Sequence, residues 1–234
     1  MIEAVGLSDQ GLVRKNNEDR FFSSAAAGLC VLADGMGGAQ AGEMASSLAV
    51  DAVVEIGTSE PPTPLLLETA FQEADRRVRE ASASDTSLRG MGTTLVAALE
   101  TPAGIAVSNV GDSRCWLWEN GRLTLLTSDQ SWANEVGRSL GLSHEVLSAH
   151  PLRHALTTAV GVGVPRQIQS RVVAARAGSV ILLSSDGLHG VATDDAIAAV
   201  LSEGGPLLFL CQGLIDIALE NGGPDNVTVV LARL

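Results

Sequence analysis

Acidic residues recur in short clusters along the chain, and each cluster lies beside an apolar run with the length and character of a β-strand. The acidic members are Glu18 with Asp19, Asp34, Asp186 and Asp225. Carboxylates that converge at the end of a buried sheet repel one another and lose hydration unless cations neutralise them. The pattern therefore predicts a metal site built from strand ends, and a fold in which distant segments share one pocket.

The composition limits the remaining possibilities. With 234 residues, 46% of them apolar, the chain has enough material for one large core, so we expect a single domain over residues 1–234. The formal net charge is −12, and this balance argues against nucleic acid and anionic lipid as partners. No apolar run approaches the ~18 residues of a membrane span, and no secretory leader follows Met1, so we expect no membrane contact and a cytoplasmic location.

The cysteine pattern argues against thiol chemistry. Cys30, Cys115 and Cys211 each lie in an apolar stretch, where a reduced thiol behaves as a small hydrophobic side chain. None of them is followed six positions later by the arginine that a cysteine-nucleophile phosphatase loop needs. We therefore expect no disulfide and no cysteine nucleophile.

Periodicity predicts a mixture of strands and helices in separate blocks. Strands are expected at residues 28–33, 93–99, 104–110, 114–118, 180–184 and 227–231, and helices at residues 42–56, 65–83, 194–201 and 207–220. Asn120 and Gly121 stand between two apolar segments, which is the strongest short signal for a hairpin. The first strand is expected to end at a tight Asp34-Gly35 loop, and residues 131–163 are expected to form a long surface excursion. Blocks joined by hairpins favour antiparallel sheets in an α+β fold.

The aspartates at the strand ends indicate the kind of metal. A single Asp-Gly pair is usually a turn, but here Asp34 and Asp186 both follow an apolar run, and Asp225 precedes another. Oxygen ligands without cysteine or histidine select Mg²⁺ or Mn²⁺ over zinc or copper. Such clusters commonly serve two-metal hydrolysis, in which the ions polarise a phosphoryl oxygen and activate water.

Together, the motifs resemble the successive signatures of the PPM/PP2C family of metal-dependent Ser/Thr protein phosphatases, in its bacterial form. They occur in the family's order at residues 8–19, 33–38, 90–94, 110–114, 185–187 and 223–228, and so span nearly the whole chain. The resemblance implies a β-sandwich of two antiparallel sheets flanked by helix pairs, in α-β-β-α layers. It also implies that residues 131–163 contain a flap beside the active site.

The resemblance assigns roles residue by residue. It implies two Mn²⁺ or Mg²⁺ ions bridged by Asp34, and a third ion is allowed at Asp112 and Asp186. Arg14 matches the arginine that binds the substrate phosphate. The implied metal positions are Glu18, Asp19 through water, Asp34, the Gly35 carbonyl, Asp112, Asp186 and Asp225.

The implied activity is hydrolysis of phosphoserine and phosphothreonine, by a metal-bridging hydroxide that attacks phosphorus. The implied enzyme is a monomer that opposes a bacterial Ser/Thr protein kinase. Met36 stands where animal relatives have histidine, and a thioether cannot donate a proton to the leaving group. His189 is near Asp186 in sequence, but a structural role for it is the simpler interpretation.

Two other functions were weighed. A pseudophosphatase would use the same scaffold as a binding or regulatory module with weak catalysis, and the intact carboxylates argue against it without excluding it. Phosphatases that form an aspartyl-phosphate need Asp-x-Asp, whereas Asp34 is followed two positions later by Met36. That second class is excluded.

Overall fold

The computed structural model describes the chain except for residues 60, 138, 143–145, 148–149, 154 and 164–167. Parts of the expected flap at residues 131–163 therefore lie outside the described residues. Within the described part of the chain, no helix has the length and apolar character needed to cross a bilayer.

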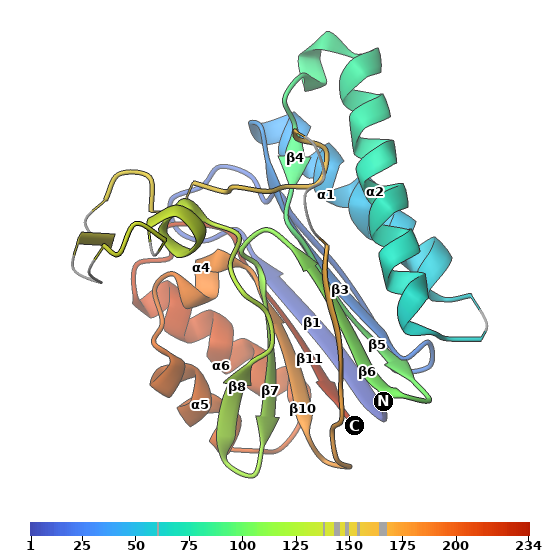
Figure 1. The fold of residues 1–234 in the computed structure, drawn as a ribbon. Coiled ribbons are helices and arrows are strands. Elements are labelled where there is room, and N and C mark those ends of the chain that lie inside the picture. The colour runs from blue at the N-terminus through green and yellow to red at the C-terminus, as the bar shows by residue number, and fades with distance from the viewer. Residues whose placement is uncertain (60, 138, 143–145, 148–149, 154, 164–167) are drawn as a thin grey trace.

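Two antiparallel sheets stack face to face at the centre of the molecule (Figure 1). The five-stranded sheet has the order β1-β11-β10-β7-β8, and the six-stranded sheet has the order β2-β3-β5-β6-β9 with β4 paired to β3. The first contains β1 (Glu3–Asp9), β7 (Arg114–Glu119), β8 (Arg122–Leu125), β10 (Val180–Ser184) and β11 (Val227–Arg233). The second contains β2 (Asp19–Ser24), β3 (Leu29–Met36), β4 (Gly92–Thr93), β5 (Leu95–Thr101), β6 (Gly104–Val110) and β9 (Gln169–Val173).

Helices cover the outer face of each sheet (Figure 1). The helices α1 (Ala39–Gly57) and α2 (Pro64–Ser84) pack on the six-stranded sheet, and α4 (Asp186–His189), α5 (Asp194–Ser202) and α6 (Leu207–Glu220) pack on the other. The 3₁₀ turn η1 (Thr86–Leu88) follows α2, and the π-helical turn η2 (Ala133–Gly137) follows β8. This arrangement confirms the predicted α-β-β-α layers.

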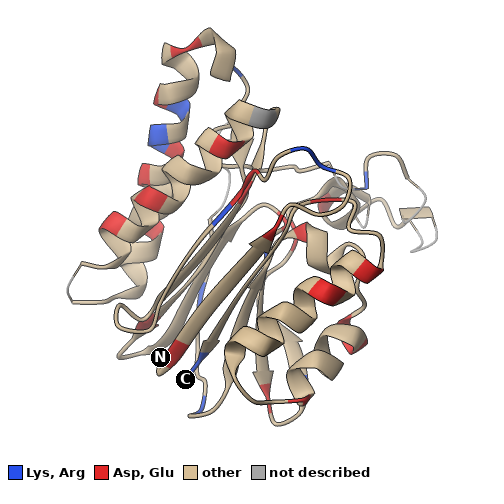
Figure 2. Ribbon diagram, turned by 180° about the vertical axis from the view of Figure 1, so that it is seen from behind, with Lys and Arg blue, Asp and Glu red and all other residues tan. Residues whose placement is uncertain are grey.

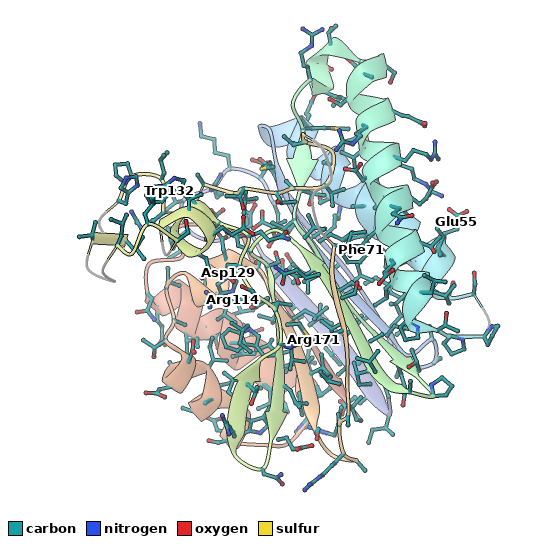
Figure 3. All side chains as sticks on the ribbon, in the orientation of Figure 1. Glu55, Phe71, Arg114, Asp129, Trp132 and Arg171 are labelled. Carbon is teal, nitrogen blue, oxygen red and sulfur yellow. The ribbon has the colours of Figure 1, made fainter. Side chains whose placement is uncertain are left out.

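Three apolar clusters correspond to the three contacts between these layers. Phe71 belongs to the cluster between α1, α2 and the six-stranded sheet (Figure 3). Trp116 belongs to the cluster beneath α5 and α6, and Cys30 and Cys115 lie in the cluster between the sheets. The three cysteines are free and buried, as their apolar surroundings predicted.

The strand β3 does not end where the sequence pattern predicted. It continues through Asp34 and Gly35 to Met36, because Asp34 pairs with Asp19 of β2 and Gly35 pairs with Thr93 of β4. Long-range pairing therefore outweighs the local turn preference of Asp-Gly. As a result the Asp34 carboxyl projects from a paired strand rather than from a loop.

The remaining element predictions vary in accuracy. The strand at residues 180–184 and the helix at residues 207–220 are confirmed to the residue, and Asn120 and Gly121 form the predicted hairpin with φ of 53° and 73°. The expected strand at 93–99 is divided at Thr94 between β4 and β5. The strands β1, β2 and β9 were not predicted.

Close packing of β3 against α1 requires a glycine at position 35. A Cβ atom at Gly35 would lie 2.1 Å from the carbonyl oxygen of Gly42 and 2.8 Å from that of Glu18. Both contacts are with backbone atoms, so side-chain rotation cannot relieve them. Gly35 thus sets the distance between the end of β3 and the first turns of α1.

We predict that Gly35→Ala lowers the free energy of unfolding by about 1–3 kcal/mol, because the added methyl overpacks this contact. Chemical denaturation followed by circular dichroism measures the change. Gly213→Ala is the matched control, since its Cβ would meet only a Val200 side-chain methyl at 3.1 Å and alanine favours a helix. Equal stability of Gly35→Ala and the unmodified protein would contradict the assigned contact.

Candidate metal centre

A polar cleft of about 760 Å³ opens where strand ends of the two sheets meet. Figure 2 shows acidic positions gathered at these strand ends, beside a short basic segment. The polar and charged residues that line the cleft include Arg14, Glu18, Asp34, Asp112, Asp186 and Asp225. Segments far apart in sequence thus contribute to one site, as the acidic clusters predicted.

Asp34 is held through its backbone by two threonines. The Asp34 N–H donates to Thr94 Oγ1 at 2.9 Å, and Thr93 Oγ1 donates to the Asp34 carbonyl at 2.8 Å. The Thr94 N–H donates to the same carbonyl at 2.9 Å. These bonds occupy the main chain and leave the Asp34 carboxyl in the cleft.

Asp19 lies opposite Asp34 in the β2–β3 ladder and is 4% exposed. Ser185 Oγ donates to Asp19 Oδ2 at 2.9 Å and accepts from the Thr228 N–H at 3.0 Å. Asp19 Oδ1 is buried and has no hydrogen-bond partner among the described residues. A buried carboxylate oxygen without a donor is costly, so this atom needs a cation or ordered water.

Asn226 organises the loop that carries Arg14 and Glu18. Its Nδ2 donates to the carbonyls of Gln10 at 2.9 Å and Asn16 at 2.8 Å. Its Oδ1 accepts from the Glu18 N–H at 2.9 Å. One carboxamide beside Asp225 therefore fixes three points of the loop after β1.

Asp112 follows β6 at a turn that a reciprocal hydrogen bond closes. The Gly111 N–H donates to Gln130 Oε1 at 2.8 Å, and the Gln130 N–H donates to the Gly111 carbonyl at 3.0 Å. Gly111 has φ of 96°, which favours glycine. Asp112 is 9% exposed and faces the cleft.

Arg14 lies at the cleft and pairs with Asp225. Its Nη2 is 2.6 Å from Asp225 Oδ2, and the other oxygen, Oδ1, accepts from the Asn226 N–H at 2.8 Å. This hydrogen bond raises the pKa of Arg14, and the charges of Asp225, Asp34 and Glu18 contribute further. The predicted phosphate-binding arginine and a predicted metal ligand thus contact each other directly.

Crowding changes the proton affinity of the central carboxyls. Burial raises the pKa of Asp34 well above its usual value, and the charges of Asp19, Asp186, Asp112 and Asp225 raise it further. Burial also raises the pKa of Asp112 to about 7, with the Asp186 charge as the next cause. Burial raises the pKa of Asp19 as well, and hydrogen bonds from Thr228 and Ser185 partly offset the effect. These shifts mark a site built for bound positive charge.

The donor set fits hard divalent cations. Within the described residues, no group of three or more acidic, histidine or cysteine side chains is arranged to hold an ion as it stands. The described lining residues include carboxylates but no cysteine or histidine, and this set, together with the buried, unpartnered Asp19 Oδ1, matches Mg²⁺ or Mn²⁺ rather than a softer metal.

The eight predicted site residues lie together. Seven of them line the cleft, and Asp19 lies beneath it beside Asp34. Sequence reasoning did not assign the supporting roles of Thr94, Ser185 and Asn226. Thr94, Ser185 and Asn226 lie within the recognised motifs, but only the fold shows which backbone groups they bind.

Met36 lines the cleft, whereas His189 is not among the lining residues. His189 Nδ1 lies 3.0 Å from Ser184 Oγ, at the end of the short helix α4. This contact supports a structural role for His189.

Comparisons with known proteins agree with this architecture. A family model described as Protein phosphatase 2C matches residues 13–208. The chain is 38% identical over 228 residues to the serine/threonine protein phosphatase PstP of Mycobacterium tuberculosis, which covers 96% of this chain and 43% of that relative. It is 34% identical over 237 residues to the serine/threonine phosphatase stp of Listeria monocytogenes, with 97% of this chain and 93% of the relative covered.

Solved structures give the same result. The crystal structure of Mycobacterium tuberculosis PstP/Ppp has a TM-score of 0.90 at 36% identity, covering 99% of this chain and 98% of the other. The PstP catalytic domain in complex with 2 manganese ions has a TM-score of 0.87 at 35% identity, covering 99% and 97%. In the sequence comparison, by contrast, the chain spans less than half the length of the full PstP relative.

We predict that chelator-treated protein loses thermal stability as the pH rises from about 4 to about 7. The unfolded chain releases protons near the ordinary value of 3.8, whereas the folded state retains them up to about 7 at Asp112 and well above 3.8 at Asp34. Stability from these groups is thus fully present below 3.8 and lost as the pH approaches 7. Bound Mn²⁺ should reverse the trend, because it binds the deprotonated carboxylates.

Thermal unfolding by circular dichroism, with and without Mn²⁺ across this range, checks the prediction. Asp34→Asn should flatten the pH dependence in chelator, because it removes one of the titrating groups. A Tm in chelator that rises with pH in this window would show that the carboxyls do not crowd as described.

Proposed function

Because this chain belongs to the protein phosphatase 2C family, we propose that it is a metal-dependent protein phosphatase that hydrolyses phosphoserine and phosphothreonine. The carboxylate-lined cleft with Asp34 at its centre and Arg14 at its edge is the observation that carries this proposal. Relatives named as serine/threonine phosphatases, at 33% to 38% identity, support it.

The metal set follows from the cleft. Asp34, Glu18, Asp186, Asp225 and the Gly35 carbonyl would hold two Mn²⁺ or Mg²⁺ ions. Asp19 would hold a coordinated water through its unpartnered Oδ1, and Asp112 with Asp186 would hold a third ion. When bound, the ions supply polarisation of the phosphoryl oxygens and activation of water.

The protein's own groups then bind and orient the phosphoryl group. The Arg14 guanidinium is half exposed and its fork of N–H groups matches two phosphate oxygens. Thr93 and Thr94 keep the Asp34 main chain fixed, so its carboxyl does not move with the substrate. Met36 cannot protonate the leaving alkoxide, so a water molecule rather than a cleft side chain is expected to donate that proton.

Residues 131–163 are proposed to act as the flap of this single domain. Its described end contributes residues 155–159 to the lining of the cleft. Trp132 stacks on His150 with ring centroids 3.9 Å apart, which ties the start of the flap to its middle (Figure 3). The proposed enzyme acts as a monomer in the cytoplasm, where it opposes a Ser/Thr protein kinase.

We predict that Asp34→Asn lowers the Mn²⁺-dependent release of phosphate from a phosphothreonine peptide by more than about 100-fold, because several kcal/mol of transition-state stabilisation depend on the ions. Asp51→Asn, on the exposed face of α1, removes the same charge and should leave the rate unchanged. Near-normal turnover of Asp34→Asn at saturating Mn²⁺ would exclude the proposed centre. No hydrolysis by the unmodified protein with either metal would favour a pseudophosphatase.

We predict that Arg14→Ala lowers kcat/KM about 10- to 150-fold, mainly through KM, because a charge-assisted contact of about 1.5–3 kcal/mol is lost. Lys15→Ala is the matched control, since Lys15 is exposed and is not among the residues that line the cleft. Steady-state kinetics on a phosphopeptide measure both variants. An equal, small effect of the two changes would remove Arg14 from phosphate binding.

A further inference from the structure

A second cleft, of about 490 Å³, lies beside the edge of the six-stranded sheet that β9 forms. It is formed by the β6–β9 edge of the six-stranded sheet and the segment that follows β8. Its lining includes Val107, Asn109, Thr127, Ser128, Gln169 and Arg171. None of its described lining residues also lines the metal cleft.

Strand register directs two polar side chains into this cleft. Val107 pairs with Arg171 and Asn109 pairs with Gln169, so all four side chains project from one face of the sheet. That face is turned toward the other sheet, because Val107 belongs to the apolar cluster between the two sheets. Asn109 therefore stands where the apolar interior gives way to the cleft.

The Asn109 side chain is buried, and its Nδ2 atom lacks a hydrogen-bond partner among the described residues. The residue is only 1% exposed. An unsatisfied buried donor costs about 1–3 kcal/mol, so native proteins rarely retain one without a reason. Its position in the lining of the cleft makes it a donor for a molecule bound there.

Arg171 supplies a positive charge to the same cleft. Figure 3 shows its side chain extending from β9 toward the sheet that contains β7 and β8. Its Nη1 donates to the Leu126 carbonyl at 2.7 Å, and it forms no ion pair within the described part of the chain. Arg114, by contrast, is satisfied by a bidentate pair with Asp129 at 2.9 Å and 2.7 Å.

The neighbouring groups add donors rather than acceptors. Thr127 Oγ1 accepts from the Cys115 N–H at 3.2 Å, so its hydroxyl proton is available to donate. Gln169 Oε1 accepts from the Ser128 N–H at 3.2 Å, which leaves the Gln169 amide group as a donor. None of the described residues that line the cleft is acidic, although the protein carries a net charge of −12.

We propose that this cleft is a binding site for a small anion that carries a carboxylate or phosphate group, held by the Arg171 guanidinium and the Asn109 carboxamide. The donor-rich lining selects an oxyanion over a cation. The volume falls within the range of small-molecule sites in proteins. This proposal does not depend on the proposed phosphatase activity.

Nuclear magnetic resonance of the nitrogen-15-labelled, metal-loaded protein tests the proposal at the two residues themselves. Inorganic phosphate and succinate are titrated separately, to distinguish a phosphate ligand from a carboxylate ligand. With at least one probe, the Asn109 carboxamide and Arg171 Nε–H signals should shift together with one common Kd. If backbone amide signals of residues in the metal cleft also shift with phosphate, they should give a different Kd, because the two clefts bind independently.

The variants identify the groups responsible. Arg171→Gln and Asn109→Leu should each raise that Kd at least about 10-fold, because each removes a donor to the anion. Arg122→Gln is the matched control, since Arg122 is an exposed β8 arginine outside the cleft lining. The proposal is overturned if neither probe moves the two signals, or if the shifts persist unchanged in a well-folded Arg171→Gln protein.

Discussion

Mutual repulsion among carboxylates at the meeting point of two sheets is the constraint on which the rest of the structure depends. Burial raises the pKa of Asp34 well above its usual value, and the nearby charges of Asp19, Asp186, Asp112 and Asp225 raise it further. A chain that gathers such charges needs a rigid frame to keep them in place. The sandwich supplies this frame, because each of these residues lies within two positions of the end of a paired strand.

The frame consists mainly of hydrogen bonds from neutral side chains to the backbone. Thr94 and Ser185 each connect two segments at the cleft, and Asn226 fixes three points of the loop after β1. Neutral groups suit this role, because they fix the main chain without adding charge to a site already crowded with it. Buried networks of this kind are strong only when every member is satisfied. Asp19 Oδ1 lacks a hydrogen-bond partner among the described residues, which identifies it as a place for a cation or its water.

Local sequence patterns predicted the parts of the fold whose apolar residues are regular. The helix at residues 207–220 and the strand at residues 180–184 each bury a continuous set of side chains, so periodicity located them accurately. The strands β1 and β9 were missed because their side chains are mostly half-buried or exposed and give no clear alternation. Their existence depends on partners distant in sequence, such as the β11 residues that face β1.

The site residues divide in the same way, into those that local patterns predicted and those that depend on contacts between distant segments. Residue types and order predicted the carboxylates, because metal chemistry restricts which side chains serve. The contact between Arg14 and Asp225 was not predictable, since 211 positions separate them and no local pattern encodes the pairing. The continuation of β3 through Asp34 was also missed, because ladder pairing there overrides a turn-forming dipeptide.

The Arg14–Asp225 pair has a consequence for the order of events at the cleft. Half of the Arg14 side chain and about a third of Asp225 are exposed, and such ion pairs are worth only about 0–1 kcal/mol. The guanidinium acts here as an internal counter-ion, which a divalent cation of higher charge would displace from the Asp225 oxygen. Cations at the proposed centre would then free an arginine for an incoming anion, so the two kinds of ligand would assist each other instead of competing. Occupancy of the proposed centre would thereby set the affinity of the cleft for negative charge.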